Sequence, residues 1–161
     1  MSKARPSSEL ISTAPPDAKV AIVAARFNAD IADELLAGCV KRLAELGVTT
    51  DRLFVFRVPG AFELPSAASM CARQNRFSAV IAIGCVIRGD TPHFEYVAGN
   101  CAQGLTLVGI NHSMPVIFGV LTTNTHQQAL DRAGGAHGHA GISAADAAIE
   151  MIHLQLVIRS L

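Results

Sequence analysis

Four short apolar runs, separated by stretches with helical periodicity, constrain the fold more than any other feature of this sequence. They cover residues 19–25, 52–58, 79–84 and 116–121 and are rich in small and β-branched side chains. Runs of this length with little alternation of polar and apolar positions are typical of strands that are buried on both faces. The sequence therefore predicts an interior sheet of four strands.

The stretches between these runs predict helices. Residues 31–46 place apolar side chains at helical spacing, Asn28 or Asp30 precedes them as a candidate cap, and Gly47 follows as a stop signal. Further helices are predicted in an Ala-rich segment at 63–74, in a long segment ending near residue 111, and from about residues 125 and 140, around a Gly-rich link at 134–141. The order βαβαβαβαα, with right-handed crossovers, predicts an α/β fold in three αβα layers around a parallel sheet.

Length and charge balance bound the kind of protein. For 161 residues we expect one domain, over residues 18–161, behind a Ser- and Pro-rich arm at 1–17 that is disordered or forms a strand against a partner. Half of the residues are hydrophobic and only 16% are charged, which predicts apolar contacts between subunits. A formal net charge of zero argues against nucleic-acid and membrane partners and favours a small-molecule ligand.

The cysteines and the N-terminus predict a cytoplasmic protein. The four cysteines, which are widely spaced in apolar segments, are expected to be buried small hydrophobes, although their number alone permits a disulfide; they are Cys39, Cys71, Cys85 and Cys101. No apolar stretch follows the basic residues near the N-terminus. The longest apolar run, 79–87, is about half as long as a membrane span.

The loops after the first two predicted strands are candidate ligand sites, because open parallel sheets bind ligands at the carboxyl ends of their strands. Phe27 follows the first strand, where its ring either stacks on a flat ligand or caps the core. The turn at Pro59 and Gly60 follows the second strand and exposes backbone N–H groups. Glu63 is either a ligand-binding carboxylate or a favourable charge at a helix start.

The loop after the third strand, residues 84–93, predicts an anion site. A glycine-containing turn that leads into a helix presents free N–H groups and the positive end of the helix dipole, and Thr91 adds a hydroxyl. The side chain of Asp90 would then point away from the anion. His93 lies in the first helical turn, where the dipole disfavours a protonated ring, so it is either a general base or a structural helix-start residue.

Two features near the C-terminal third bear on the same chemistry. Arg132 is either a bidentate partner for phosphate or a charge that complements the end of a helix. His137 and His139 have no third ligand nearby in sequence, so we expect a polar loop and no metal site.

Five segments together resemble the lumazine synthase family in identity, order and spacing. They are residues 26–28 (Arg-Phe-Asn), 58–63 (Val-Pro-Gly-Ala-Phe-Glu), 86–94 (Val-Ile-Arg-Gly-Asp-Thr-Pro-His-Phe), 116–119 (Val-Ile-Phe-Gly) and 132–134 (Arg-Ala-Gly). The resemblance extends from Lys19 to the C-terminus. It implies a flavodoxin-like domain assembled as pentamers, with active sites between subunits and an N-terminal strand that could add to a neighbouring sheet.

The resemblance also implies a reaction and a set of site residues. The reaction condenses 5-amino-6-(D-ribitylamino)uracil with 3,4-dihydroxy-2-butanone 4-phosphate, without cofactor or metal, in the penultimate step of riboflavin biosynthesis. The implied pyrimidine and ribityl contacts are Phe27, Asn28, Ala61, Phe62, Glu63, Val86, Ile87 and, from the adjacent subunit, Phe118. The implied phosphate contacts are Gly89, Asp90, Thr91 and Arg132, and His93 would move protons during phosphate elimination.

One departure and two alternatives accompany the resemblance. Several members of the family carry a lysine where this chain has Ala140, and only His139 lies close to that position in sequence. We expect this difference to alter binding more than chemistry. A lumazine or flavin carrier would keep the stacking pocket but has no use for an anion site, and an FMN module would need a phosphate loop after the first strand.

Overall fold

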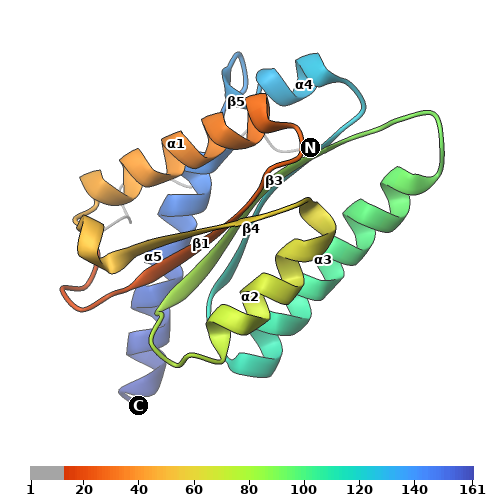
Figure 1. Ribbon diagram of the computed structural model, residues 1–161. Helices are drawn as coiled ribbons and strands as arrows, with labels where there is room; N and C mark the ends of the chain where they lie inside the picture. Colours follow the sequence, from red (N-terminus) through yellow and green to blue (C-terminus); the bar gives the residue numbers. More distant parts are fainter. Residues whose placement is uncertain (1–12) are drawn as a thin grey trace.

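The computed structural model describes residues 13–161 and has the predicted three layers, with a parallel sheet between two pairs of helices (Figure 1). The sheet order is β2-β1-β3-β4, and the strands are β1 (Val20–Ala25), β2 (Leu53–Val58), β3 (Ala79–Ile87) and β4 (Val116–Thr123). The apolar runs thus predicted the sheet. Strands β3 and β4 continue beyond their runs because they pair with each other as far as Ile87 and Thr123.

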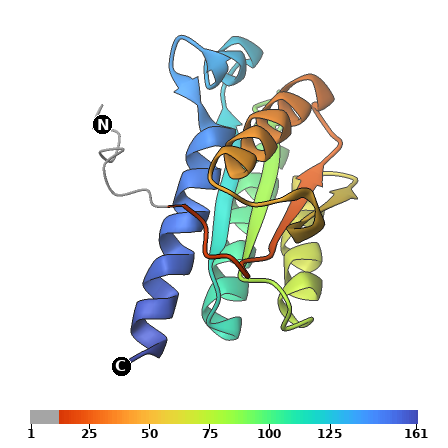
Figure 2. The same ribbon diagram turned by 90° about the vertical axis from the view of Figure 1, so that its left-hand side faces the viewer.

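Two helices cover each face of the sheet. Helices α1 (Ala29–Glu45) and α5 (Ala140–Arg159) lie on one face, and α2 (Leu64–Ala72) and α3 (His93–His112) lie on the other (Figure 2). Successive side chains of β1 point to opposite faces, so Ile22 packs with the first pair of helices and Val23 with the second. Burial on both faces is the physical reason that β1 and β3 are wholly apolar, whereas β2, at the edge of the sheet, leaves Val55 and Phe56 exposed.

The segments around the last two helices are more ordered than the sequence predicted. In place of a Gly-rich link, β5 (Ala133–Gly135) and β6 (Gly138–His139) form a small antiparallel hairpin. The left-handed φ angles of Gly134 (114°) and Gly138 (84°) suit residues without a Cβ. The short helix α4 (His126–Leu130) precedes the hairpin and is capped by Thr125, whose side chain accepts a hydrogen bond from the Gln128 N–H.

Two short 3-10 helices and one unusual cap complete the connections. The 3-10 turns η2 (Thr50–Arg52) and η3 (Ala61–Glu63) precede β2 and α2, so α2 begins one residue later than expected. Asn28 occupies the N-cap position of α1 in a left-handed conformation (φ 53°), but its side chain makes no capping bond. The prediction of Asn28 as a cap is therefore confirmed for its position, although its side chain takes no part in the capping.

The predicted N-terminal arm is covered only in part. Residues 1–12, and with them the expected strand against a neighbour, lie outside the described residues. Residues 13–17 lie against the body of the chain: the Ala14 N–H donates to the Leu46 carbonyl over 2.7 Å, and His153 Nε2 lies 2.8 Å from the Thr13 carbonyl oxygen.

Helix α5 is, within residues 13–161, the one helix long and apolar enough to cross a membrane by length and composition alone. A core helix passes the same test, so this is weak evidence for a membrane span. One stripe of α5, from Gly141 to Ile152, packs in the core beside α1. Its other faces expose Met151, Leu154 and Ile158.

Burial of the cysteines leads to a first prediction. Burial raises the pKa of Cys39 to about 12 and those of Cys85 and Cys101 to about 11, and it also raises the pKa of Cys71. At pH 8 only about one in a thousand thiols with a pKa of 11 is ionised. We expect no reaction of the native protein with a thiol reagent within minutes, and four equivalents after unfolding in urea. A native thiol that reacts at the unfolded rate would contradict this burial.

Candidate active site

The carboxyl ends of β1, β2 and β3 bring three of the predicted loops to one edge of the sheet. Backbone bonds fix the first two loops together, because the N–H groups of Arg26 and Phe27 donate to the carbonyls of Val58 and Pro59 over 2.9 and 3.1 Å. The Phe27 ring is 69% exposed, so it does not cap the core of this chain. An exposed aromatic face beside these loops is available for stacking on a flat ligand.

The loop after β2 presents a carboxylate and a second exposed ring. Glu63 Oε2 accepts a hydrogen bond from the Gly60 N–H over 2.9 Å, which fixes the carboxylate at the start of the helical segment. Ala61 is buried, while Phe62 is 58% exposed. The Glu63 carboxylate therefore has both a structural partner and, at its other oxygen, capacity to accept from a ligand hydroxyl.

Asn28 ties the loop after β1 to the end of β3. Its Nδ2 donates to the Cys85 carbonyl over 2.9 Å, one residue before Val86. Val86 is nearly buried and Ile87 partly so, which leaves their backbone as the polar surface that they offer. The amide of Asn28 is thus used inside the protein, and its place beside Val86 is decided by this bond.

The segment after β3 is an exposed turn at the start of α3, which we call the anion turn after the site predicted there. Gly89, Asp90 and Thr91 are all exposed, and α3 begins at His93 as expected. The Thr91 hydroxyl accepts from the His93 N–H over 3.4 Å, so it stands at the helix start. The turn therefore combines a glycine, a hydroxyl and the positive end of a 20-residue helix.

Arg88 supports this turn and was not singled out by the sequence. Its backbone N–H donates to the Thr123 carbonyl over 2.8 Å, and its Nε donates to Asn124 Oδ1 over 2.9 Å. Its Nη1 donates to Glu95 Oε1 over 2.6 Å, and its guanidinium lies 4.2 Å from the centre of the Phe94 ring. One side chain thus links both ends of the turn to the end of β4. The signal available in the sequence was an arginine directly before Gly-Asp, followed by Glu95 in the first turn of the next helix.

A second prediction concerns Arg88. Because its pair with Glu95 is solvent-exposed, Arg88→Gln should change the free energy of unfolding by only about 0–1 kcal/mol. It should nevertheless raise the KM for a phosphate-bearing substrate by about tenfold, since the turn loses its support and small misplacements of a binding group are costly. Steady-state kinetics beside urea unfolding would measure both, with Arg73→Gln as control. A loss of stability without a KM effect would refute the supporting role.

The charges beside this edge do not make Cys85 a nucleophile. Burial, and to a lesser degree the Asp30 carboxylate, raises the pKa of Cys85 to about 11. The hydrogen bond with His126, 2.5 Å from Asp30, lowers the pKa of Asp30 below its usual range and joins α4 to the first turn of α1. Within residues 13–161 no three His, Cys, Asp or Glu side chains gather as metal ligands would.

Two predicted site residues lie elsewhere, on a second surface. Phe118, which is 44% exposed, and Arg132 line a groove of about 400 Å³ along β4 and the start of α5. Ala140 and Ser143 line it too, whereas Phe27, Glu63 and His93 do not. Among the described strands, β4 pairs on one side only, with β3. The groove thus contains Phe118 and Arg132 but no residue of the anion turn.

His139 differs from the expectation of a polar loop. Its ring nitrogens are buried between the middle of α1 and the start of α5, with no hydrogen-bond partner among the described residues. The hairpin strand β6 turns the side chain inward against α1. The residue next to Ala140 in the sequence therefore does not direct its ring outward.

Comparison with known proteins agrees with this arrangement. A family model described as 6,7-dimethyl-8-ribityllumazine synthase matches residues 17–155. Relatives of that name from Yersinia pestis and Yersinia pseudotuberculosis are each 50% identical over 147 residues, which are 91% of this chain and 94% of the relative. The match spans all four sheet strands, the three loops at their carboxyl ends and the groove along β4. The chain belongs to the 6,7-dimethyl-8-ribityllumazine synthase family.

Proposed function

We propose that this chain condenses 5-amino-6-(D-ribitylamino)uracil with 3,4-dihydroxy-2-butanone 4-phosphate, giving 6,7-dimethyl-8-ribityllumazine, inorganic phosphate and water. The family implies small-molecule substrates and oligomeric assembly. The observation that carries the proposal for this chain is the edge of the sheet at which the exposed Phe27 ring, the Glu63 carboxylate and the exposed anion turn before His93 follow three successive strands of the sheet. These groups suit a flat ring, a polyol chain and a phosphate.

The first half of this site holds the uracil substrate. Phe27 stacks on the pyrimidine, Asn28 keeps the end of β3 in place, and the backbone of Val86 and Ile87 bonds the ring edge. The ribityl hydroxyls lie against Ala61, Phe62 and Glu63, where the free oxygen of the carboxylate accepts from them. Stacking together with polar contacts at the edge fixes the amino group for attack on the ketone.

The second half holds the phosphate and manages protons. The N–H groups and hydroxyl of Gly89, Asp90 and Thr91 bind the phosphate oxygens, and Arg132 supplies a bidentate positive partner. The amine adds to the ketone with loss of water, phosphate then leaves by elimination, and attack of the second nitrogen on the remaining carbonyl closes the ring with loss of a second water. His93 accepts the proton that elimination removes. An anion site that strengthens as charge gathers on the departing phosphate favours that step.

The active site is completed between neighbouring subunits. Because Phe118 and Arg132 line the groove along β4, they reach the anion turn of a second copy and not that of their own chain. The assembly is built from pentamers, and residues 18–161 form one domain. Exposed apolar side chains on α5, including Met151 and Leu154, support burial against other copies. The enzyme works in the reducing cytoplasm.

The test follows lumazine fluorescence when purified protein is mixed with the two substrates. Wild-type protein should form product above the spontaneous background, and the variants Arg132→Ala and His93→Ala should each form less. Pentamers assembled from a mixture of these two variants should regain activity, because some interfaces then combine an intact His93 with an intact Arg132. Lumazine binding without turnover would favour a carrier instead. If the wild-type protein is active but the mixed pentamers regain no activity, both residues belong to the site of one subunit.

A further inference from the structure

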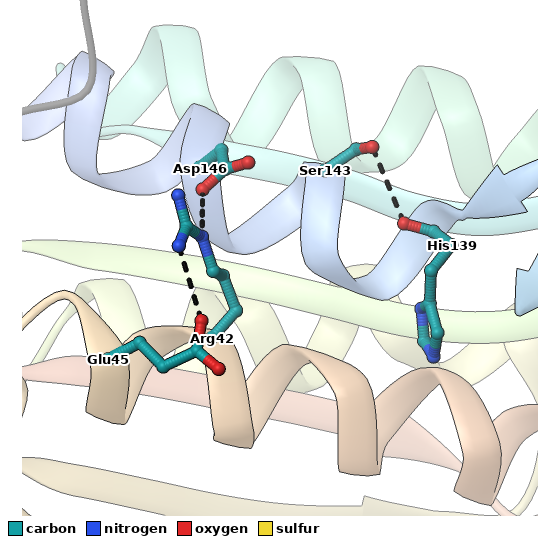
Figure 3. A network of polar contacts seen from close by, with 5 residues as sticks. All are labelled: Arg42, Glu45, His139, Ser143 and Asp146. Carbon is teal, nitrogen blue, oxygen red and sulfur yellow. Dashed lines mark hydrogen bonds and ion pairs between the residues drawn. The ribbon is translucent and has the colours of Figure 1, made fainter. Parts of the chain in front are cut away.

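The imidazole of His139 is a largely buried polar ring that makes no hydrogen bond within residues 13–161. Its side chain is 11% exposed, and neither Nδ1 nor Nε2 has a hydrogen-bond partner among residues 13–161. The nearest charge is Glu34 Oε1, at 3.8 Å from Nε2 and mostly exposed. Figure 3 shows the ring extending from the start of α5 toward α1. A buried polar group left unpaired is costly, so hydrogen bonding does not explain the histidine at this position.

Glycines make the space that this ring fills. A Cβ added to Gly38 of α1 would lie 2.1 Å from Cε1 of His139, and one added to Gly141 would lie 3.1 Å from the same atom. Gly134 of the hairpin also faces the ring, at 3.5 Å from Cδ2. Glycine in a helix costs about 1 kcal/mol relative to alanine, so Gly38 is unfavourable for α1 taken alone. The ring therefore fills the space that these three glycines leave, which we call the glycine cradle (Gly38, Gly134 and Gly141).

His139 anchors the backbone segment that contains Arg132. His139 pairs with Ala133 across the β5–β6 hairpin. On either side of the ring, the Ala140 N–H donates to the Arg132 carbonyl over 2.8 Å and the His137 N–H donates to the Asp131 carbonyl over 2.7 Å. The packing of the His139 ring against α1, together with these two backbone hydrogen bonds, thus fixes the position of Arg132 relative to α1.

We infer that His139 is a positioning residue for phosphate binding: seated in the glycine cradle of α1 and α5, its ring sets the placement of the β5–β6 hairpin and so of Arg132. This inference rests on the proposed role of Arg132. His139 also borders the groove that Arg132 lines, but its buried nitrogens exclude direct contact with substrate. It acts by shape, because neither ring nitrogen has a hydrogen-bond partner among residues 13–161.

The first experiment separates shape from chemistry at position 139. His139→Ala should raise the KM for the butanone phosphate, and the inhibition constant of inorganic phosphate, by about tenfold, because the hairpin loses its anchor. The KM for the ribitylaminouracil and kcat should change less than twofold. His139→Leu, which fills the cradle without nitrogen atoms, should restore most of the phosphate affinity. If the leucine variant is as poor as the alanine variant, shape is not what the ring contributes.

A double-mutant cycle tests the same packing contact by changing Gly38, the residue of α1 that the ring contacts. Gly38→Ala should expel the ring and raise the same two constants by about tenfold. Added to His139→Ala, where the space is already vacant, it should raise them less than twofold further. If the effects of Gly38→Ala and His139→Ala on these constants multiply in the double variant, the two residues do not act through one contact and the inference is overturned. If His139→Ala assembles poorly, the phosphate constants of Gly38→Ala and His139→Leu still test the inference.

Arg132→Ala serves as the reference that separates this inference from the proposed function. If it leaves both phosphate constants unchanged, the role proposed for Arg132 is wrong, and the inference falls with it. If Arg132→Ala raises both constants while His139→Ala and Gly38→Ala do not, the proposed function stands and the inference about His139 is overturned. Parallel changes in all three variants are the expected outcome.

Discussion

Replacement of His93 by alanine is expected to lower kcat for lumazine formation by about 100-fold. General acid–base groups contribute about 10²–10⁴ in rate, and the lower end applies because orientation of the two substrates supplies much of the acceleration. The ring lies at the first residue of α3, directly after the anion turn, where it can take a proton as phosphate leaves. Single-turnover fluorescence would measure the chemical step separately from product release.

Binding should survive this substitution. The Kd values for lumazine product and for inorganic phosphate are expected to change less than threefold in His93→Ala, because the stacking ring and the turn remain. His112→Ala, at the opposite end of the same helix, is the matched control and should keep wild-type kcat. Equal losses in both variants would mean that α3 itself is disturbed. An unchanged kcat in His93→Ala would remove His93 from proton transfer.

Replacement of Gly141 by alanine is expected to destabilise the fold by about 3 kcal/mol, since overpacking a close-packed contact costs about 1–3 kcal/mol or more. The added Cβ would lie 2.0 Å from the carbonyl oxygen of Leu35 and 2.8 Å from its carbonyl carbon, both of which are backbone atoms of α1. A flexible side chain could turn away, but these atoms cannot. Helices α1 and α5 would have to separate, and Arg42, which pairs with Asp146 over 2.6 Å between them, would lose its partner.

Thermal unfolding at fixed protein concentration would measure this loss. For a chain of this size, about 3 kcal/mol corresponds to a midpoint lowered by roughly 6–12 °C. Gly99→Ala on α3 is the matched control, because among residues 13–161 nothing lies within 4 Å of the Cβ that it adds. That variant should be neutral or slightly more stable, as alanine is the better helix former. Equal midpoints for the two variants would show that the α1–α5 contact yields without cost.

The fold was predictable from a few particular segments. The runs at β1 and β3 hold only small and β-branched residues, which no surface element tolerates, and the helical spacing before Gly47 gave α1 to within two residues of its start. The hairpin at β5 and β6 was not predicted. It is too short to show strand periodicity, and its pairing is made by backbone groups that any sequence carries.

The candidate site divides in the same way. Phe27, Glu63 and His93 follow predicted strands, so their gathering at one edge follows from parallel topology. The support given by Arg88 to the anion turn, and the burial of His139, depend on contacts with residues distant in sequence, such as Asn124 and Gly38. A sequence read alone treats an arginine and a histidine in loops as solvent-exposed groups.

The sequence by itself determined the layers of this protein, the order of its elements and the identity of the groups at the strand ends. Apolar periodicity is a local property, and burial of apolar surface has few solutions once it is set. Only the tertiary structure decided that Phe118 and Arg132 face a groove separate from the anion turn, and that His139 points inward. Those outcomes depend on close approach between helices and on which strand lies at the sheet edge, where a difference of one methyl group decides what fits.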